Sequence, residues 1–384
     1  MSPLRILQIN SMLKGGGTDD QCIALAGGLG QLGQTVFLAG PGGNPFAERI
    51  AQLEVPFFDT GRTANKFQFV LRAARFIRRQ RIQIVHGHHG RDLWPAVLAA
   101  RLAGTHPAIV LTRHLAKSPG AWVSRRFLLG QCDALIAVSQ FVAKVLREGV
   151  YQPDSPEPER RRRPPMRGDH GKIQVIYGGI DTAKFKPAPA HEMRRQLGLS
   201  PGDFAFAVAG GFDFPRGKGQ REFLAAAARI HKEVPQARFL IIGRGALAGI
   251  LTADVARLGL GKKAWLTGQV ADMPLAMNAI DCLVHAQIGT EALGLVVCEA
   301  HACGKPVIAS DLDGIPEAFA PGGYGRMVAP ENIGELAQAM KRQALEGKLD
   351  LTEAGSLHAR VAEFFSISRM AAGVLDLYRK ATRG

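Results

Sequence analysis

The chain has 384 residues, of which 46% are hydrophobic and 21% are charged, which is ordinary for a globular protein and long enough for two domains. Its formal net charge of +15 suggests an anionic partner: nucleic acid, an anionic membrane surface or a phosphorylated substrate. The five Cys residues form no CxxC pair, which argues against a disulfide framework or a zinc ribbon and favours reduced thiols.

The chain opens with an apolar segment, residues 4–9, that predicts a first strand. Nothing before it has the architecture of a signal peptide, and no window approaches the roughly 20 apolar residues that span a bilayer. We therefore expect a cytoplasmic protein. Any membrane contact is expected to be peripheral, on the inner face of the cytoplasmic membrane.

Short apolar runs alternate with helical patterns through the first part of the chain. Each run is followed by a loop and a helix, which is typical of a parallel sheet flanked by helices. The predicted strands are residues 4–9, 36–39, 82–86, 108–111 and 134–138, and a helix is predicted over residues 21–32.

Residues 151–171 interrupt this pattern. They contain five Pro and the run Arg160-Arg-Arg-Arg163 without hydrophobic periodicity, which predicts a flexible, solvated loop. A second α/β series follows, with strands predicted at residues 172–177, 204–209, 238–242, 264–266, 282–285 and 306–309.

The predicted fold class is therefore α/β with two domains, residues 1–171 and 172–366. A last amphipathic helix, residues 367–384, is expected to pack back onto the first domain. Ligands of such sheets bind outside the carboxyl ends of the strands, so the site is expected in the cleft between the two domains.

The segment that follows residues 282–285 carries the strongest functional signal. Glu291 lies in a short loop before an apolar helix that starts around Leu293, and the free N–H groups of such a helix start can bind a diphosphate without a metal. Glu299 lies eight residues further on, about two helical turns, where it can accept two hydrogen bonds from a ribose diol. The alternative is that both carboxylates are solvated helix charges, but the strongly apolar helix around them disfavours it.

This segment resembles the Glu-x7-Glu motif of family 4 glycosyltransferases. The resemblance covers nearly the whole chain and implies the GT-B fold, in which two Rossmann-like domains with parallel sheets face each other across a cleft. It further implies that Glu291 binds the sugar, that Glu299 binds the ribose, and that Leu293, Gly294 and Leu295 line the donor site. The tetrapeptide Glu291-Ala-Leu-Gly294 is most similar to the bacterial lipopolysaccharide-core glucosyltransferase I branch.

Three further stretches of the second domain resemble this family. Residues 209–219 resemble its phosphate-binding strand end, which implies that Lys218 contacts the diphosphate as a compact cation. Phe212 stands where many members have Arg, and Arg216 is predicted to supply the missing charge. The resemblance also implies a glycine turn at Gly243, and a strand end at Thr267 and Gly268 whose backbone reads the nucleobase.

The first domain contributes a glycine turn and a group of histidines. No acidic residue ends the second strand, which argues against a dinucleotide oxidoreductase. Gly16 and Gly17 match the family's Gly-Gly turn, which faces the donor phosphates. The run His86-Gly-His-His89 lacks Cys or carboxylate partners at ligand spacing, so a role in lining the cleft is favoured over metal binding. His114 matches a family histidine that hydrogen-bonds the donor sugar.

Two patterns allow more than one interpretation. Asp311-Leu-Asp313 has the DxD pattern that holds a metal in other transferases, but the family has no metal there, and we expect neither metal nor cofactor. Residues 65–81 and 122–129 are amphipathic and basic. Either could lie on an anionic membrane, or each could pack on its own sheet and carry solvated Arg. No motif supports binding to nucleic acid.

The sequence therefore predicts a retaining, metal-independent hexosyltransferase. Its donor would be a nucleotide diphosphate sugar, UDP-linked, and its acceptor a lipopolysaccharide-core or other membrane-associated glycan. Glu291, His114 and Lys218 are the predicted catalytic residues, in a front-face mechanism whose leaving-group charge is stabilised electrostatically. A nucleotide-sugar epimerase or hydrolase on the same fold, and a non-catalytic nucleotide-sugar-binding protein, remain alternatives.

Overall fold

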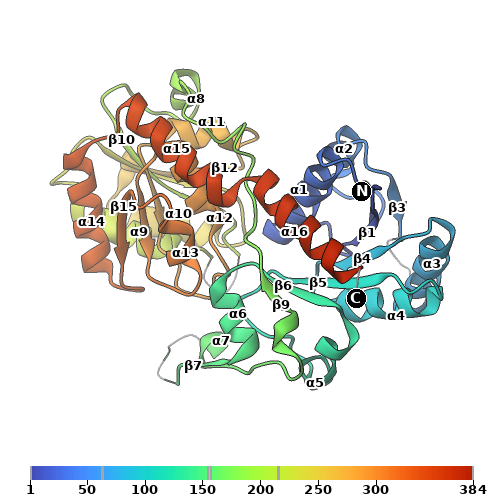
Figure 1. Cartoon of the computed structure of the whole chain (residues 1–384). Coiled ribbons are helices and arrows are strands. Elements are labelled where there is room, and N and C mark those ends of the chain that lie inside the picture. The colour runs from blue at the N-terminus through green and yellow to red at the C-terminus, as the bar shows by residue number, and fades with distance from the viewer. Residues whose placement is uncertain (1, 62–64, 154, 156–157, 214–216, 383–384) are drawn as a thin grey trace. The chain divides into compact units, whose positions relative to one another are not determined.

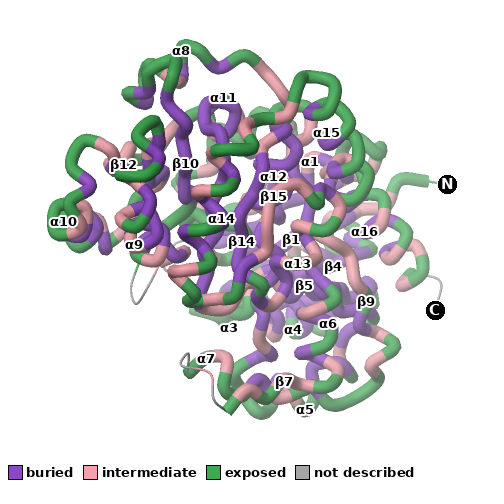
Figure 2. Tube along the Cα trace, turned by 90° about the vertical axis from the view of Figure 1, so that its left-hand side faces the viewer, coloured by how far each residue is buried: buried purple, intermediate pink, exposed green. Residues whose placement is uncertain are grey.

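The computed structural model describes residues 2–61, 65–153, 155, 158–213 and 217–382, and Figure 1 shows the whole chain. The chain forms two compact units. Unit 1 comprises Met1–Gly179 together with Phe365–Gly384, and unit 2 comprises Ile180–Phe364. Each unit is built around its own parallel sheet, and the strands of both sheets are largely buried (Figure 2).

Unit 1 contains a seven-stranded sheet in the order β3-β2-β1-β4-β5-β6-β9, in which every neighbouring pair is parallel. The strand order reverses between β1 and β4, which is where Rossmann-like sheets bind ligands. The strands are β1 (Arg5–Ile9), β2 (Thr35–Gly40), β3 (Phe57–Asp59), β4 (Ile84–Gly87), β5 (Ala108–Arg113), β6 (Ala134–Ala137) and β9 (Ile173–Val175).

Helices cover both faces of this sheet, and the last helix of the chain is one of them. The helices of unit 1 are α1 (Gly17–Gln31), α2 (Ala47–Gln52), α3 (Lys66–Arg79), α4 (Leu93–Ala103), α5 (Trp122–Gln131), α6 (Gln140–Arg147), α7 (Pro158–Arg161) and α16 (Ile367–Ala381). Helix α16 packs beside α1 (Figure 1). A Cβ atom at Gly28 of α1 would lie 2.9 Å from the Cβ atom of Ala371, so glycine is needed there for the two helices to approach.

The segment between β6 and β9 departs from the sequence prediction. Strand β7 (Val150–Tyr151) pairs antiparallel with β8 (Arg162–Arg163). The side chain of Arg163 is buried, where its guanidinium lies 4.9 Å from the ring centroid of Phe141 and donates to the carbonyl of Ala116. The prediction of a solvated loop is therefore wrong for Arg163, because a ring face and a carbonyl replace water around its charge.

Unit 2 contains a six-stranded sheet in the order β12-β11-β10-β13-β14-β15, again with parallel neighbours throughout. Its strands are β10 (Phe204–Ala209), β11 (Ala237–Ile242), β12 (Ala264–Gly268), β13 (Cys282–His285), β14 (Val307–Ser310) and β15 (Gly325–Val328). Its helices are α8 (His191–Gln196), α9 (Gln220–Ile230), α10 (Ala248–Arg257), α11 (Met273–Ala279), α12 (Leu295–Ala302), α13 (Ile315–Phe319), α14 (Ile333–Glu346) and α15 (Leu351–Phe365).

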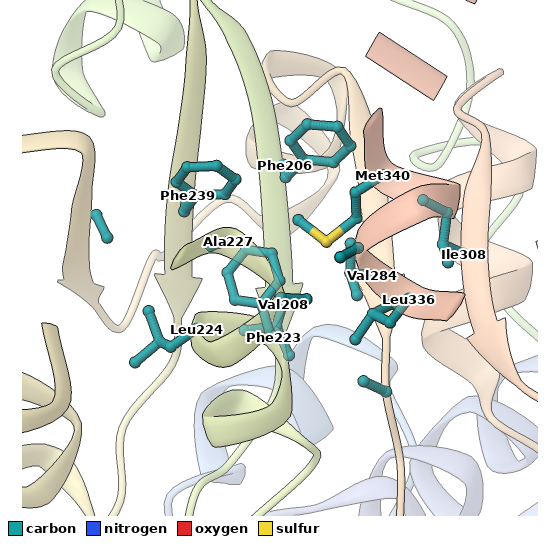
Figure 3. Close-up of a cluster of buried hydrophobic side chains, with 14 of the residues drawn as sticks. Phe206, Val208, Phe223, Leu224, Ala227, Phe239, Val284, Ile308, Leu336 and Met340 are labelled. Atoms are coloured by element: carbon teal, nitrogen blue, oxygen red, sulfur yellow. The ribbon is translucent and has the colours of Figure 1, made fainter. Parts of the chain in front are cut away.

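The core of unit 2 lies between the sheet and the helices α9 and α14. Figure 3 shows Phe206 and Phe239 of the sheet facing Phe223 of α9 and Met340 of α14. All four side chains are fully buried. Burying such side chains is the main favourable contribution to folding, and it fixes α9 and α14 against the strands whose ends carry the candidate site.

The predicted boundary at residue 172 lies before β9, whereas unit 2 begins at Ile180. Strand β9 pairs with β6 and so extends the sheet of unit 1. The edge strand β15 escaped the sequence analysis because it is short and partly exposed. The predicted fold class, two Rossmann-like α/β halves with parallel sheets, is confirmed. Within the described residues, no helix combines the length and apolar character needed to cross a bilayer.

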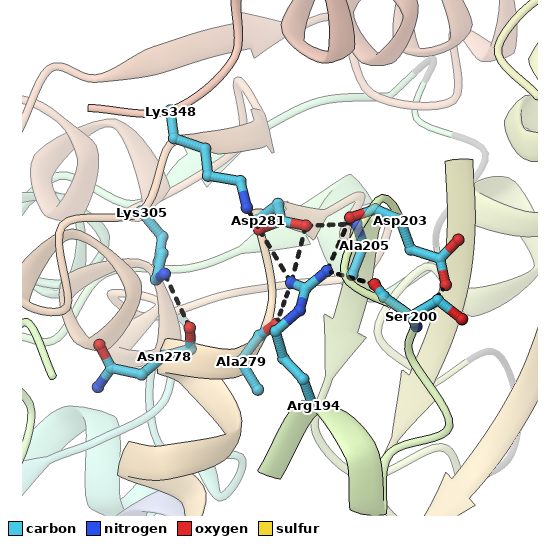
Figure 4. A network of polar contacts seen from close by, with 9 residues as sticks. All are labelled: Arg194, Ser200, Asp203, Ala205, Asn278, Ala279, Asp281, Lys305 and Lys348. Carbon is cyan, nitrogen blue, oxygen red and sulfur yellow. Dashed lines mark hydrogen bonds and ion pairs between the residues drawn. The ribbon is translucent and has the colours of Figure 1, made fainter. Parts of the chain in front are cut away.

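A buried carboxylate ties the start of unit 2 to its sheet (Figure 4). The side chain of Asp281, immediately before β13, is 2% exposed. It accepts hydrogen bonds from Arg194 of α8 at 3.0 Å and from the backbone N–H of Ala205 at 2.8 Å, and the ammonium of Lys348 lies 2.5 Å away. One charge therefore holds α8, β10 and the segment before α15 together.

We expect Asp281→Asn to lower the free energy of unfolding by about 3 kcal/mol, because the largely buried guanidinium of Arg194 loses its counter-charge. Urea denaturation followed by tryptophan fluorescence measures the change. Glu233→Gln is the control, since the Glu233–Lys341 ion pair is exposed and such pairs contribute within about 0.5 kcal/mol. Equal losses in the two variants would contradict the structural role of Asp281.

Candidate functional site

The predicted site residues of unit 2 gather at the carboxyl edge of its sheet. Strands β10 and β13 are neighbours, and the strand order reverses between them. The loop after β10 leads to Lys218, and the loop after β13 carries Glu291 to the start of α12. Two loops that are distant in sequence therefore deliver their side chains to one place.

Lys218 and Glu291 form an ion pair at this edge, with the ammonium nitrogen 2.5 Å from Oε2 of the carboxylate. The side chain of Glu291 is only 15% exposed. Burial alone would raise the pKa of Glu291, but the ammonium of Lys218 holds that pKa below its ordinary value. Glu291 is therefore an ionised, acceptor-only group at neutral pH.

Two further contacts fix the carboxylate and the backbone of Glu291. Its Oε1 accepts the backbone N–H of Ala292 at 3.1 Å, and its own N–H donates to Oδ2 of Asp313 at 3.3 Å. Asp313, the second carboxylate of the DxD pattern, thus serves here to hold the Glu291 loop. The sequence analysis had assigned it no such role.

Glycine is required beside Lys218. Gly219 has φ of 85°, and a Cβ atom there would lie 1.9 Å from the carbonyl oxygen of Ala286. The loop after β10 therefore packs directly on the backbone that follows β13, which no other residue allows. The backbone N–H of Lys218 donates to Oε1 of the buried Gln220 at 2.6 Å. These contacts orient Lys218 toward Glu291.

The N-terminus of α12 lies beside Glu291 of this ion pair. Its N-cap residue Gly294 has φ of 87°, no side chain caps the helix, and its first turn contains no acidic residue. The first N–H groups of such a helix have no intrahelical acceptor and attract anions. Leu293 is buried and Leu295 is half-buried at this helix start, and Glu299 lies half-buried further along α12.

His285, the last residue of β13, belongs to this group although the sequence analysis gave it no role. Its ring is 2% exposed, and Nε2 lies 3.9 Å from Oε2 of Glu291. Neither ring nitrogen has a hydrogen-bond partner among the described residues. Burial lowers the pKa of His285 to about 4, so the imidazole is neutral. The sequence offered one signal for this role, since His285 is a polar residue at the end of an apolar strand.

Phe212 follows β10 at the position where the family resemblance implies Arg, and the structure buries its side chain in the core of unit 2. Its backbone N–H donates to the carbonyl of Arg244 at 3.2 Å, which joins the loop after β10 to the loop after β11. The side chain of Arg244 is exposed, and it makes no hydrogen bond or ion pair with any described residue. Arg216, the predicted replacement, lies outside the described residues.

Gly243, Thr267 and Gly268 lie along the same edge of the sheet. The N–H of Gly243 donates to the carbonyl of Gly268 at 3.0 Å, and the hydroxyl of Thr267 donates to that carbonyl at 3.0 Å. A Cβ atom at Gly243 would lie 2.3 Å from the carbonyl oxygen of Gly210, so the ends of β10 and β11 approach closely. These contacts join the ends of β10, β11 and β12, and of the three predicted residues only Gly268 is exposed.

In unit 1, the glycine turn after β1 is held by a buried carboxylate. Asp19 accepts the backbone N–H groups of Lys14 and Gly15, each at 2.9 Å. Gly16 and Gly17 are exposed, and their N–H groups have no acceptor among the described residues. A Cβ atom at either glycine would meet nothing within 4 Å. The turn thus leaves two N–H groups and open space in front of them.

The histidines of unit 1 form a buried cluster at the ends of β4 and β5. Nδ1 of His88 lies 3.4 Å from Nε2 of His114, and the rings of His86 and His88 are 4.0 Å apart. Burial lowers the pKa of His86 and the pKa of His114 to about 3, so both imidazoles are neutral. The part of the chain that the structure describes contains no group of His, Cys, Asp and Glu fit to hold a metal ion, and metal independence stays a prediction.

The structure thus brings Lys218, Glu291 and Gly294 together in unit 2, and sets His114 in a histidine cluster in unit 1. Gly16 and Gly17 also lie in unit 1. The predicted cleft joins residues of separate units, and its geometry stays a prediction.

Comparison with known proteins gives these sites a context. Residues 15–155 match the family model described as Glycosyltransferase Family 4, and residues 204–344 match the model described as Glycosyl transferases group 1. A D-inositol 3-phosphate glycosyltransferase of Segniliparus rotundus is 33% identical over 229 residues, which cover 56% of this chain and 49% of the relative. The chain therefore spans about half the length of that relative.

Solved structures resemble the whole chain. A glycosyltransferase of Rickettsia africae matches with a TM-score of 0.82 at 21% identity and covers 100% of both chains. Anabaena HepE in complex with UDP and glucose matches with a TM-score of 0.79 at 20% identity, covering 98% of this chain and 100% of the other. The predicted GT-B fold is thereby confirmed. Two stretches of the chain thus match glycosyltransferase family models, and the whole chain has the GT-B fold.

Proposed function

We propose that this chain is a retaining hexosyltransferase whose donor is a UDP-linked sugar and whose acceptor is a hydroxyl of a membrane-associated glycan, of which the lipopolysaccharide core is our first candidate. The observation that carries the proposal is the Lys218–Glu291 ion pair beside the uncapped N-terminus of α12. A cation, an ionised acceptor and free helix N–H groups together suit a sugar diphosphate.

The diphosphate would bind to the positive groups of this edge. Lys218 and the N-terminus of α12 supply two of them, and the free guanidinium of Arg244 supplies a third from the loop joined to Phe212. As the bond between the sugar and the diphosphate breaks, negative charge grows on the leaving oxygen. Fixed cations and N–H dipoles stabilise that charge without reorganising. Metal and organic cofactors have no part in this proposal.

Glu291 would hold the sugar. An ionised carboxylate accepts hydrogen bonds from two hydroxyls, and its pKa is held low enough for this at neutral pH. In the front-face mechanism, the acceptor oxygen bonds to the anomeric carbon on the face from which the diphosphate leaves. The hydroxyl proton passes to the departing diphosphate oxygen, and the anomeric configuration is retained.

The nucleobase of the donor and the identity of the acceptor are proposed from different relatives. The structure of Anabaena HepE holds UDP and glucose, which favours a UDP-linked donor. The name of the Segniliparus rotundus relative favours inositol 3-phosphate as a second candidate acceptor. A glycan and a phosphorylated polyol differ in charge and size, so an acceptor panel distinguishes them.

Of the two amphipathic segments, we propose α5 as the membrane contact. The apolar face of α3, which includes Phe69, Val70 and Ile77, is buried inside unit 1, so the packing alternative holds for α3. On α5, Trp122 is 61% exposed and Phe127 is 44% exposed. Aromatic side chains among arginines suit the interface of an anionic membrane, and we place this contact on the cytoplasmic face.

We expect Glu291→Gln to lower the turnover of transfer at least about 100-fold, because the sugar loses its charged acceptor while the shape of the side chain remains. The measurement is nucleotide release from a panel of nucleotide sugars with core oligosaccharide or inositol 3-phosphate as acceptor, and NMR of the product gives its anomeric configuration. Glu233→Gln, an exposed change in the same unit, is the control.

Full activity of Glu291→Gln would overturn the assignment of Glu291. Nucleotide release that needs no acceptor would identify an epimerase or a hydrolase instead. Binding of nucleotide sugar without release under any acceptor would identify a non-catalytic binding protein.

We expect Arg244→Gln to raise the KM for the donor about tenfold with a smaller effect on kcat, because a charge-assisted contact to the diphosphate is lost. Arg195→Gln is the matched control, since Arg195 is an exposed arginine of α8 whose ion pair lies on the surface. Steady-state kinetics against donor concentration measures both. Unchanged donor kinetics in Arg244→Gln would exclude Arg244 from the diphosphate site.

We expect the double change Trp122→Ala and Phe127→Ala to lower the binding to anionic lipid vesicles at least about fivefold, because the exposed aromatic rings of α5 are removed. Vesicle flotation measures the bound fraction. Phe67→Ala is the control, since Phe67 is an exposed aromatic of α3, 69% accessible to solvent. A loss of binding in Phe67→Ala alone would assign the contact to α3 instead.

A further inference from the structure

A fully buried tyrosine links the last helix of the chain to the histidine cluster of unit 1. Tyr378 lies on α16, and its hydroxyl oxygen is 2.6 Å from Nδ1 of His86, a residue 292 positions earlier in the chain. Neither side chain is exposed. Burial raises the pKa of Tyr378 well above its ordinary value, so the hydroxyl keeps its proton and can donate it to the imidazole.

His86 is held from both sides. Its second nitrogen, Nε2, lies 2.6 Å from the hydroxyl oxygen of Thr112 on β5. A neutral imidazole carries one donor and one acceptor nitrogen, so the two hydroxyls that flank His86 set its ring orientation and its tautomer together. Loss of either hydroxyl leaves a buried nitrogen without a partner, which is costly.

The held ring of His86 supports the two histidines beyond it. His88 packs on His86 with ring centroids 4.0 Å apart, and His88 stacks in turn on His114 with centroids 5.7 Å apart. Nδ1 of His88 and Nε2 of His114 are within 3.4 Å, so one of these nitrogens donates to the other. His114 itself is only partly buried, unlike His86 and His88. The chain of contacts therefore ends on the least buried of the three residues.

Tyr378 lies on the segment of chain that returns from unit 2. Helix α15 belongs to unit 2 up to Phe364, Ser366 separates it from α16, and α16 packs in unit 1. The buried hydroxyl therefore connects the returning helix to the histidine cluster through a polar contact as well as through apolar packing against α1. If Tyr378 served only apolar packing, its ring would be sufficient and its hydroxyl would not be needed.

We propose that Tyr378 is a positioning residue, which fixes His86 and, through the stacked ring of His88, sets the orientation of His114 toward the sugar. The inference rests on the proposed function, since it takes His114 as the hydrogen-bonding partner of the transferred hexose. It adds that the C-terminal helix completes the histidine cluster of unit 1. Thr112 is the second positioning residue, acting on His86 from the opposite side.

Tyr378→Phe removes the hydroxyl and keeps the ring. We expect kcat to fall about tenfold, because small misplacements of a contacting group lower turnover steeply, while the KM for the donor stays within about twofold. Thr112→Val is expected to act alike, and Thr112→Ser, which keeps the hydroxyl, to retain the wild-type kcat. Because both changes act through His86, the double variant should lose less than the product of the two single losses.

Tyr151→Phe is the matched control, because Tyr151 is an exposed tyrosine of unit 1. Thermal unfolding of every variant shows whether it is folded, and Thr112→Val carries the test if Tyr378→Phe does not fold. A kcat within about twofold of wild type in both single variants would overturn the proposal.

A second readout does not depend on activity. Nitrogen-15 NMR of the full chain with labelled histidine reports the tautomer of each imidazole, and Tyr378→Phe should shift the signals of both His86 and His114. A shift at His86 with none at His114 would overturn the positioning of His114. If the wild-type chain transferred no sugar to any acceptor, the proposed function would fail, and the NMR signals would still decide whether Tyr378 orders the histidines.

Discussion

The ion pair between Lys218 and Glu291 is the contact on which the candidate site of unit 2 depends. It forms because the loops after β10 and β13 leave one edge of a parallel sheet side by side, and because Gly219 lets the first loop rest on the backbone of Ala286. The pair keeps Glu291 ionised although it is largely buried. A negative ligand at Lys218 would compete for the same ammonium, so under the proposed function phosphate binding would be coupled to release of the carboxylate toward the sugar.

The edge of the sheet in unit 1 carries neutral histidines instead of an ion pair. Burial keeps its histidines neutral, and their positions are fixed by hydroxyls and ring stacking instead of by charge. A neutral imidazole can both donate and accept, whereas a carboxylate only accepts and an ammonium only donates. In the proposed function, unit 2 would offer fixed charges to the diphosphate and a carboxylate to the sugar, and unit 1 would offer neutral imidazoles to sugar hydroxyls.

Much of this arrangement could be predicted from sequence, because local patterns determine it. Short apolar runs separated by helices predicted the parallel strands, and the family resemblance of two segments indicated Lys218 and Glu291 as site residues. Contacts between distant residues left no such pattern. The hydrogen bond between Tyr378 and His86 joins residues 292 positions apart. The pattern of an amphipathic helix does not indicate which tyrosine hydroxyl forms a buried hydrogen bond. Arg163 was misjudged because a run of arginines usually indicates solvent, while Phe141 provides a ring face that only the fold brings near.

Position 212, where the family resemblance implies Arg, is occupied by a Phe that has two structural roles. Phe212 contributes its side chain to the core and its backbone to the neighbouring loop, since its N–H meets the carbonyl of Arg244. The two loops are thus joined, and a cation carried by either reaches the same edge of the sheet. A diphosphate responds to the total positive potential around it more than to the origin of each charge. Under the proposed function, the guanidinium of Arg244 would add positive potential at the edge that carries Lys218, while Phe212 contributes an aromatic ring to the core of unit 2.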